Sequence, residues 1–394
     1  MCSRPVLDSR HRHRAQSRPP ARPSLALLIV VSSFLSGCGI FFGGDDVADS
    51  ETPGWRRDLT TTSTTPAEVV AVTTSTGATT TSMPTSSPSS SGPTASLQLR
   101  AKQCAGLELA EETTAQSPFL SETSGVVSSA THPGVLWAHN DSGSRAAVVA
   151  VGVDGANLGA FALPLDSSVD IEDIALVDGM LYLADIGDND QIRSEIAIYR
   201  FAEPDPSSPS PISEVETIRA RYPDGAHDAE AFLIDPLSGQ MIIIDKTFAI
   251  SAGAGGGGLL APNPATVWVA SPPFGSEVTL EQAGTIALDQ LATLTSAPAA
   301  TSLAGQLGVG GLATGADVRA DGELIAVRTY DTVWLFERSP GQSVADALAG
   351  QPCEAPTRPE EQGEAVGFLG DTSRAFVTIA EGRAPTINIT TEQE

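Results

Sequence analysis

Short apolar runs recur along residues 98–394, and the polar residues beside them recur as well. Each unit begins with an acidic residue, continues into an apolar run, turns at glycine or proline, and continues into a second apolar run. Copies cover residues 170–185, 227–245, 314–328 and 362–380, and a fifth at 124–138 lacks the leading acid. Apolar runs bounded by turn residues predict antiparallel β-strands, and their recurrence predicts a repeat fold.

Further strands are predicted after each pair. Third strands fall at 148–153, 196–201, 266–269, 332–336 and 386–389, and fainter fourth strands at 160–163, 215–222 and 285–288. Four antiparallel strands that recur without helical periodicity are typical of β-propeller blades. A β-sandwich is the alternative, but its strands would not repeat an acidic start at the same point of each unit. We predict an all-β propeller of five four-stranded blades, or six if residues 251–313 hold another.

The two ends of the propeller domain, residues 97–394, predict how the ring closes. The last unit has three strands and residues 97–109 supply an extra one, so we expect the N-terminal strand to complete the last blade. Cys104 and Cys353 are the two cysteines of this domain. In an oxidising compartment we expect them to form a disulfide at the seam, with two unpaired, buried cysteines as the alternative.

The first 96 residues predict export and attachment to a membrane. Residues 1–24 are basic and rich in proline, and the apolar run at 25–35 is too short to cross a bilayer core of roughly 30 Å. The run ends in Leu35-Ser36-Gly37-Cys38, which resembles the lipobox of bacterial lipoproteins. The resemblance implies a signal peptide at 1–37 and an acyl chain such as palmitate on Cys38, which would anchor the protein to the cell membrane, facing outside the cytoplasm. An ordinary signal with an incidental cysteine is the alternative.

Residues 38–96 are rich in serine, threonine and proline, so they bury too little apolar surface to fold. We expect a disordered tether between the anchor and the propeller. The charge of the chain excludes one class of partner, because it carries 48 Asp and Glu against 22 Lys and Arg, for a net charge of -26. Nucleic acids are bound by clustered basic residues, and the lysines number two, Lys102 and Lys246, so we expect no nucleic-acid partner.

The predicted blade geometry brings many acidic residues to one end of the propeller axis. The start of a blade's first strand and the end of its second lie on the same face because the strands are antiparallel. Oxygen-rich ligation at this face favours calcium over zinc. The candidate metal ligands are Glu172, Asp173, Asp185, Asp188, Glu230, Asp317 and Glu364. Lys246 and Arg328 are candidate anion-binding residues, and His139, Asp141 and His227 are the other axial residues.

A structural role is the alternative for the same side chains. Acidic residues at blade starts can cap turns and accept hydrogen bonds from backbone N–H groups of neighbouring blades. Lys246 and Arg328 can then form salt bridges within the ring, which would relieve its repulsion. The sequence contains no Gly-x-Ser-x-Gly nucleophile motif and no Cys/His zinc spacing.

Five short motifs resemble exported bacterial β-propellers that are distantly related to phytase-like propellers. The motifs lie at 139–143, 170–175, 185–189, 227–231 and 328–330. The resemblance implies that Glu172, Asp173, Asp185, Asp188 and Glu230 cradle calcium while Lys246 and Arg328 contact substrate phosphate. Two functions follow. The first is a membrane-tethered propeller that binds an unknown ligand or protein partner on its acidic face, and the alternative is a calcium-dependent hydrolase of phosphate esters.

Overall fold

The computed structural model describes residues 104–110, 112–142, 145–165, 170–208, 210–252, 258–296 and 302–393. The predicted signal peptide, Cys38 and the predicted tether lie outside these residues. Within the described ranges, no helix is both long enough and apolar enough to cross a membrane.

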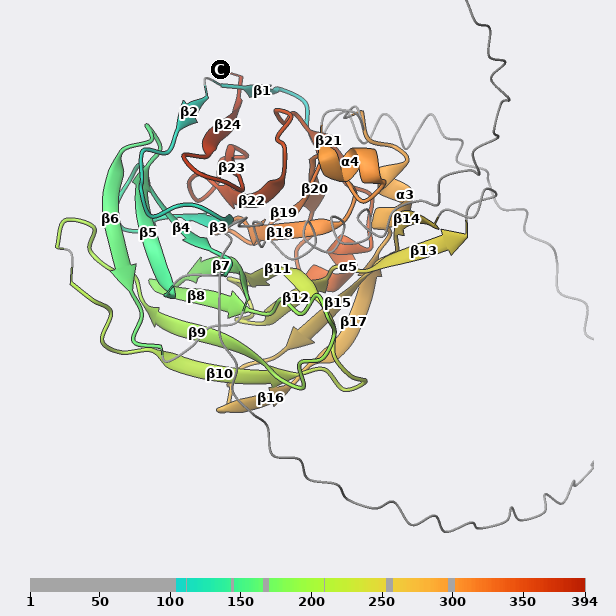
Figure 1. Ribbon diagram of the computed structural model, residues 1–394, viewed down its shortest axis with the longest axis horizontal. Helices are drawn as coiled ribbons and strands as arrows, with labels where there is room; N and C mark the ends of the chain where they lie inside the picture. Colours follow the sequence, from blue (N-terminus) through green and yellow to red (C-terminus); the bar gives the residue numbers. More distant parts are fainter. Residues whose placement is uncertain are drawn as a thin grey trace, which may run out of the picture.

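Five antiparallel sheets surround one axis, so the predicted five-bladed β-propeller is confirmed (Figure 1). From the axis outward, the first blade contains β3 (Thr123–Ser128), β4 (Val135–Asn140), β5 (Ala147–Gly152) and β6 (Asn157–Ala162). The second contains β7 (Ile171–Val177), β8 (Met180–Asp185), β9 (Ile196–Ala202) and β10 (Glu216–Arg221). The third contains β11 (Ala229–Ile234), β12 (Met241–Asp245), β15 (Ala265–Ala270) and β17 (Glu281–Ile286).

The last two blades close the ring. The fourth contains β18 (Ala313–Val318), β19 (Leu324–Thr329), β20 (Val333–Glu337) and β21 (Cys353–Ala355). The fifth contains β22 (Gly363–Phe368), β23 (Phe376–Ala380) and β24 (Thr386–Glu392), and its outer strand is β1 (Leu107–Leu109), beside the short β2 (Thr113–Thr114). β1 pairs antiparallel with β24, as expected for closure by the N-terminal strand. The predicted disulfide between Cys104 and Cys353 joins the fifth blade to the fourth, with a Cα–Cα distance of 6.0 Å.

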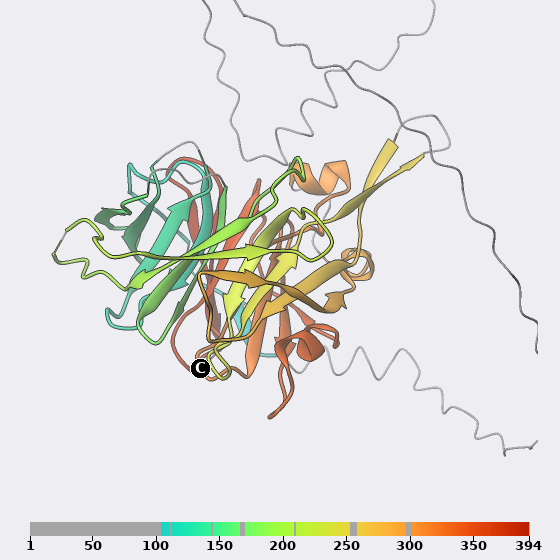
Figure 2. The same ribbon diagram turned by 90° about the horizontal axis from the view of Figure 1, so that it is seen from below.

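The long connection within and after the third blade holds local elements in place of a sixth blade. The hairpin β13 (Phe248–Ala252) and β14 (Gly258–Pro262) projects from the body (Figure 2). Strand β16 (Glu277–Thr279) pairs parallel with β10 of the second blade, and so links two neighbouring blades. Helices α3 (Leu288–Ala292) and α4 (Leu303–Leu307) precede the fourth blade, and α5 (Val344–Leu348) connects β20 to β21. These short helices were not predicted by the apolar pattern.

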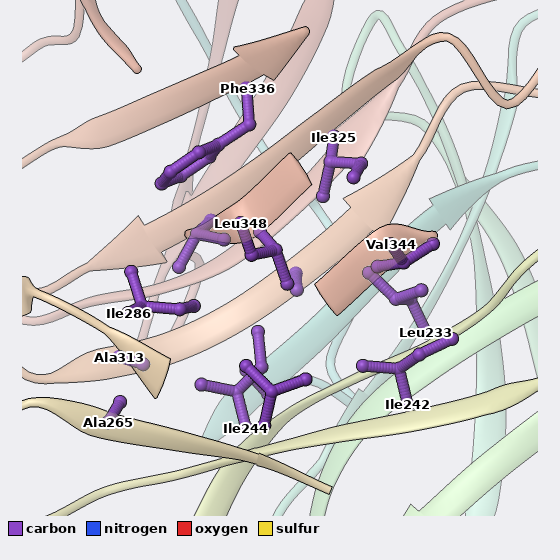
Figure 3. Packing of buried hydrophobic residues seen from close by; sticks show 14 of the residues in the cluster. Leu233, Ile242, Ile244, Ala265, Ile286, Ala313, Ile325, Phe336, Val344 and Leu348 are labelled. Carbon is purple, nitrogen blue, oxygen red and sulfur yellow. The ribbon is translucent and has the colours of Figure 1, made fainter. Parts of the chain in front are cut away.

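The apolar faces of adjacent blades pack against each other to form the core. Between the third and fourth blades, Ile242 and Ile244 pack in one cluster with Ile325 and Phe336, and α5 adds Leu348 (Figure 3). All residues of β11, β18 and β22 are buried, because an inner strand has a blade on each side. The inner strands therefore have little room for large polar side chains, and those they do carry are constrained by close neighbours.

Candidate functional site

Each of the five inner strands contains a β-bulge at its start. The strand register shifts at Thr123/Gly125, Ile171/Asp173, Ala229/Ala231, Ala313/Gly315 and Gly363/Ala365. A bulge leaves one residue unpaired and re-aims its side chain. We call the unpaired residues the bulge ring: Ser124, Glu172, Glu230, Thr314 and Glu364. The inner strands begin at this end of the axis, which we call the upper end, and finish at the lower end.

The bulge ring links neighbouring blades through its two hydroxyl groups. Ser124 Oγ donates to the backbone oxygen of Glu172 at 2.7 Å and contacts its Oε2 at 3.2 Å. Thr314 Oγ1 donates to the backbone oxygen of Gly363 at 2.9 Å. The three glutamates of the ring are each 6% exposed. Three buried carboxyl groups around one axis need a counter-charge, a proton or a cation.

Lys246 supplies part of that counter-charge. It follows β12 directly, is 1% exposed, and forms an ion pair with Glu230 Oε1. Its Nζ also lies 3.3 Å from the hydroxyl of Tyr330, which comes from the turn after β19. The positive charge of Lys246 lowers the pKa of Glu172, Asp228 and Glu364, among others, so one ammonium group is shared by carboxyl groups from several blades.

The carboxyl groups at the upper end nevertheless have raised pKa values. Burial is the main cause for Glu172, whose pKa lies well above its usual value, and nearby Asp170 adds repulsion. Burial, followed by repulsion from Glu381, raises the pKa of Glu364 to about 8. Burial raises the pKa of Asp141 to about 8 and that of Glu381 to about 7. At neutral pH this cluster is therefore partly protonated, and a cation that entered it would compete with those protons.

The seven predicted metal ligands separate into two groups. Glu172, Glu230 and Glu364 belong to the bulge ring, whereas in each of the other four both carboxylate oxygens accept at least one hydrogen bond from the chain. Asp173 Oδ1 accepts from the amide of Ile174, and its Oδ2 accepts from the amides of Phe232 and Ala316. Asp173 thus joins the second, third and fourth blades at the axis, which is the role that the structural alternative described.

Asp185 and Asp188 are also held by local donors. Asp185 accepts from Arg193 at 2.8 Å and from the hydroxyl of Tyr199 at 3.1 Å. Asp188 accepts from the backbone amides of Ile192 and Arg193, and so closes the turn that follows β8. Both aspartates fix the loop between β8 and β9 beside the upper end.

Asp317 lies toward the lower end and is not a member of the bulge ring, although it is near enough to Asp173 to raise the pKa of that carboxyl. The structure aligns Thr314, rather than Asp317, with Glu172 and Glu230 at the bulge position. Asp317 is three residues further along β18, and accepts from the amides of Val318 and Phe368 at 2.8 and 2.7 Å. The repeat pattern predicted Asp317 at a strand start because its acidic side chain was aligned with the leading acids of the other units. The bulges show that β18 begins before Thr314, so Asp317 lies near the end of that strand.

The remaining predicted residues are not members of the bulge ring. Arg328 is fully buried and pairs with Glu360 at 2.9 Å, while its Nε and Nη1 have no partner among the described residues. His139 is buried beside Gly125, and burial lowers its pKa to about 4. His227 packs against the rings of Tyr222 and Trp268, which also contact each other, and it lies 3.0 Å from Asp224 and 3.4 Å from Asp245.

Sequence reasoning missed some members of this site. Ser124, Thr314 and Tyr330 were overlooked because they carry no charge, and Asp170 because the strand start was assigned to Glu172 and Asp173. A usable signal was present in the next residue, which is small in four of the five inner strands: Gly125, Ala231, Gly315 and Ala365. Aligning the repeat units on that small residue would have placed Ser124, Glu230, Thr314 and Glu364 at equivalent positions.

The donor chemistry of the upper end fits a hard cation such as calcium. Glu230 Oε2 is buried and has no hydrogen-bond partner among the described residues. The carboxylates of Glu172 and Asp170 converge on the Cα of Gly187, where a Cβ would collide with both. No three His, Cys, Asp or Glu side chains of the described ranges are already spaced to hold a metal ion. Binding would therefore require the carboxylates to draw together.

Comparisons with known proteins leave the function open. No protein-family profile and no curated protein matches the chain. One solved structure, of a protein described as a "putative gluconolactonase", is 14% identical and aligns over 73% of this chain and 93% of that chain, with a TM-score of 0.35. A similarity this low supports no statement about activity, and the propeller architecture follows from the strand pairing itself.

Proposed function

We propose that this protein is an extracytoplasmic, membrane-tethered binding protein whose upper end takes up a cation, with calcium as the preferred ion. The observation that supports the proposal is the bulge ring, in which three inner strands place the buried side chains Glu172, Glu230 and Glu364 at the same end of one axis. Oxygen donors of this kind suit calcium, which accepts six to eight oxygen ligands in flexible geometry. The bound ion would form part of the surface that a ligand or protein partner contacts.

The unpartnered Glu230 Oε2 is the second support for the proposal. A buried carboxylate oxygen without a donor costs free energy, and a cation would recover it. The carboxylate oxygens of Glu172 and Asp170 both lie where a side chain on residue 187 would be, so the absence of a Cβ at Gly187 lets these two carboxylates approach each other. We therefore propose Glu230, Glu172, Glu364 and Asp170 as the ligands. Asp185 and Asp188 would hold the loop beside them, and Asp173 would hold the inner strands together.

We favour binding over hydrolysis of phosphate esters because of the contacts of the two candidate anion-binding residues. Lys246 pairs with Glu230, and Arg328 pairs with Glu360 beneath the surface. Each cation already has a carboxylate partner, and phosphate would have to displace it. Calcium-dependent turnover of p-nitrophenyl phosphate that disappears in Glu230→Gln would reverse this preference.

The deciding experiment is thermal unfolding of the purified protein in excess chelator and in millimolar calcium. A ligand present at 100 times its Kd stabilises the native state by about 2.7 kcal/mol, so we expect the Tm to rise by several degrees. The rise should be smaller in Glu230→Gln, Glu172→Gln and Glu364→Gln, each compared with its own Tm in chelator. Glu281→Gln, an exposed change on outer strand β17, is the matched control and should keep the full rise.

The absence of any calcium-dependent rise in the wild-type protein would disprove the metal proposal and leave the bulge ring as blade architecture. The membrane tether has its own test. We expect Cys38→Ser to release the protein from membranes into the medium, and mass spectrometry of the wild-type N-terminus to find acylated cysteine. Release of the wild-type protein into the medium without an acyl chain would disprove the anchor while leaving the metal proposal standing.

A further inference from the structure

A cavity lies at the lower end of the axis, at the opposite end from the bulge ring. Its volume is about 240 Å³, and it is lined by the far ends of four inner strands, β3, β7, β18 and β22, by the turns after them, and by Pro236 in the turn after β11. Its walls are mixed: Val127, Leu176, Val318 and Phe368 form an apolar part, and serine and aspartate side chains form a polar part. Small-molecule pockets are usually about 300–1,000 Å³. This cavity therefore suits a very small ligand or one side chain.

Asp317 is the buried charged residue of the cavity. It lines the wall, is 8% exposed, and its carboxylate is held in place by the amides of Val318 and Phe368. Each of its oxygens uses one hydrogen bond, and a carboxylate can accept about four. Burial raises the pKa of Asp317 to about 7, and the hydrogen bonds from Phe368 and Val318 partly offset that rise.

The residues around the cavity have one sign of charge. Asp178 and Asp371 also line it, both are exposed, and no lysine, arginine or histidine is among its lining residues. A ligand complementary to these walls needs a compact positive charge for the carboxylate and an aliphatic body for the apolar wall. An ammonium group on a short alkyl chain meets both requirements.

We propose that the lower cavity binds a primary alkylammonium group, with its charge on Asp317 and its aliphatic chain against Val127, Leu176 and Phe368. The site is separate from the bulge ring and is independent of the proposed calcium binding. A free amine and a lysine side chain of a partner share this chemistry, and the cavity volume accommodates either of them.

The test is isothermal titration of the purified protein with n-butylammonium chloride, with 1-butanol and sodium chloride as the neutral and ionic controls. We expect saturable binding of n-butylammonium and none of the controls. Asp317→Asn should weaken the binding at least about tenfold, because a hydrogen bond to a charged group is lost. Asp190→Asn, an exposed aspartate near the upper end, should leave it unchanged.

A second variant covers the case in which Asp317→Asn does not fold. Ala320→Trp alters an exposed residue of the lining and should block the cavity without touching Asp317. Tighter binding of n-butylammonium than of Nα-acetyl-lysine methylamide would support a free amine, and the reverse would support a partner's lysine. Equal binding of 1-butanol and n-butylammonium, or full binding by both variants, would overturn the proposal. Calcium should not alter this binding, so its failure and that of the calcium site are distinguishable.

Discussion

The carboxylate of Asp173 accepts a hydrogen bond from the backbone amide of Ala316 at 2.9 Å, across the axis of the propeller and 143 positions along the chain. The same oxygen accepts from the amide of Phe232 in the intervening blade at 2.8 Å. One side chain thus ties three of the five inner strands together. An acidic residue at a blade start can therefore hold the ring closed without contacting any ligand.

We predict that Asp173→Asn destabilises the protein by about 3 kcal/mol, because an amide nitrogen would face backbone N–H donors that have no other acceptor. Asp173 is fully buried, so water cannot replace the hydrogen bonds that the substitution removes. The measurement is denaturant unfolding of the variant beside Asp371→Asn, an exposed aspartate that should behave like the wild type. A midpoint for Asp173→Asn within experimental error of the control would show that the three amides have other acceptors.

The ion pair between Lys246 and Glu230 should be strongly coupled. We predict that Lys246→Met destabilises the protein by about 3–5 kcal/mol, because it leaves a buried carboxylate without its cation. The double variant with Glu230→Leu should recover much of that loss, since neither charge then remains. Unfolding free energies of the two single variants and the double variant give the coupling directly. Additive losses would mean that the two groups do not depend on each other.

The disulfide should contribute substantially to stability because Cys104 and Cys353 are separated by 249 positions. In the chain-entropy model a loop of this length stabilises the native state by roughly 5 kcal/mol. We predict that Cys353→Ser lowers the Tm by about 10 °C or more, and that a reducing agent does the same to the wild type. A reducing agent should have no effect on the Cys353→Ser protein, which is the matched control.

Stability without calcium should fall as the pH rises from 5 to 8. Burial raises the pKa values of Asp141, Asp317 and Glu381 to about 8, 7 and 7, so the native state binds more protons than the unfolded chain between these values and about pH 4. Each group then lowers the unfolding free energy by about 1.4 kcal/mol per pH unit. Burial lowers the pKa of His139 to about 4, so the unfolded chain binds more protons at this residue than the native state does. His139 therefore increases the unfolding free energy as the pH rises from about 4 to 6.5.

The measurement for this prediction is denaturant unfolding in chelator at several pH values. The Asp317→Asn protein should show a shallower decline between pH 5 and 7 than the wild type. An unfolding free energy that increases between pH 6.5 and 8 would contradict the raised carboxyl pKa values.

The sequence by itself determined the architecture of the folded domain. Repeated apolar runs bounded by turn residues predicted the strands of five blades, and the three-stranded last unit predicted closure by the N-terminal strand. The pairing of β1 with β24 and the disulfide confirm that closure. These features were predictable because strand periodicity and cysteine number are local or compositional properties, which a repeat fold reproduces in every unit.

Only the tertiary structure decided which acidic residues face the axis. Glu172 and Asp173 are adjacent in sequence, yet the bulge directs Glu172 into the ring, and Asp173 binds amides of two other blades. Asp317 looked like a blade-start acid but lies at the lower cavity. A shift of one residue in a strand reverses the direction of a side chain, and the position of a bulge depends on the packing of neighbouring blades, which an apolar pattern does not encode.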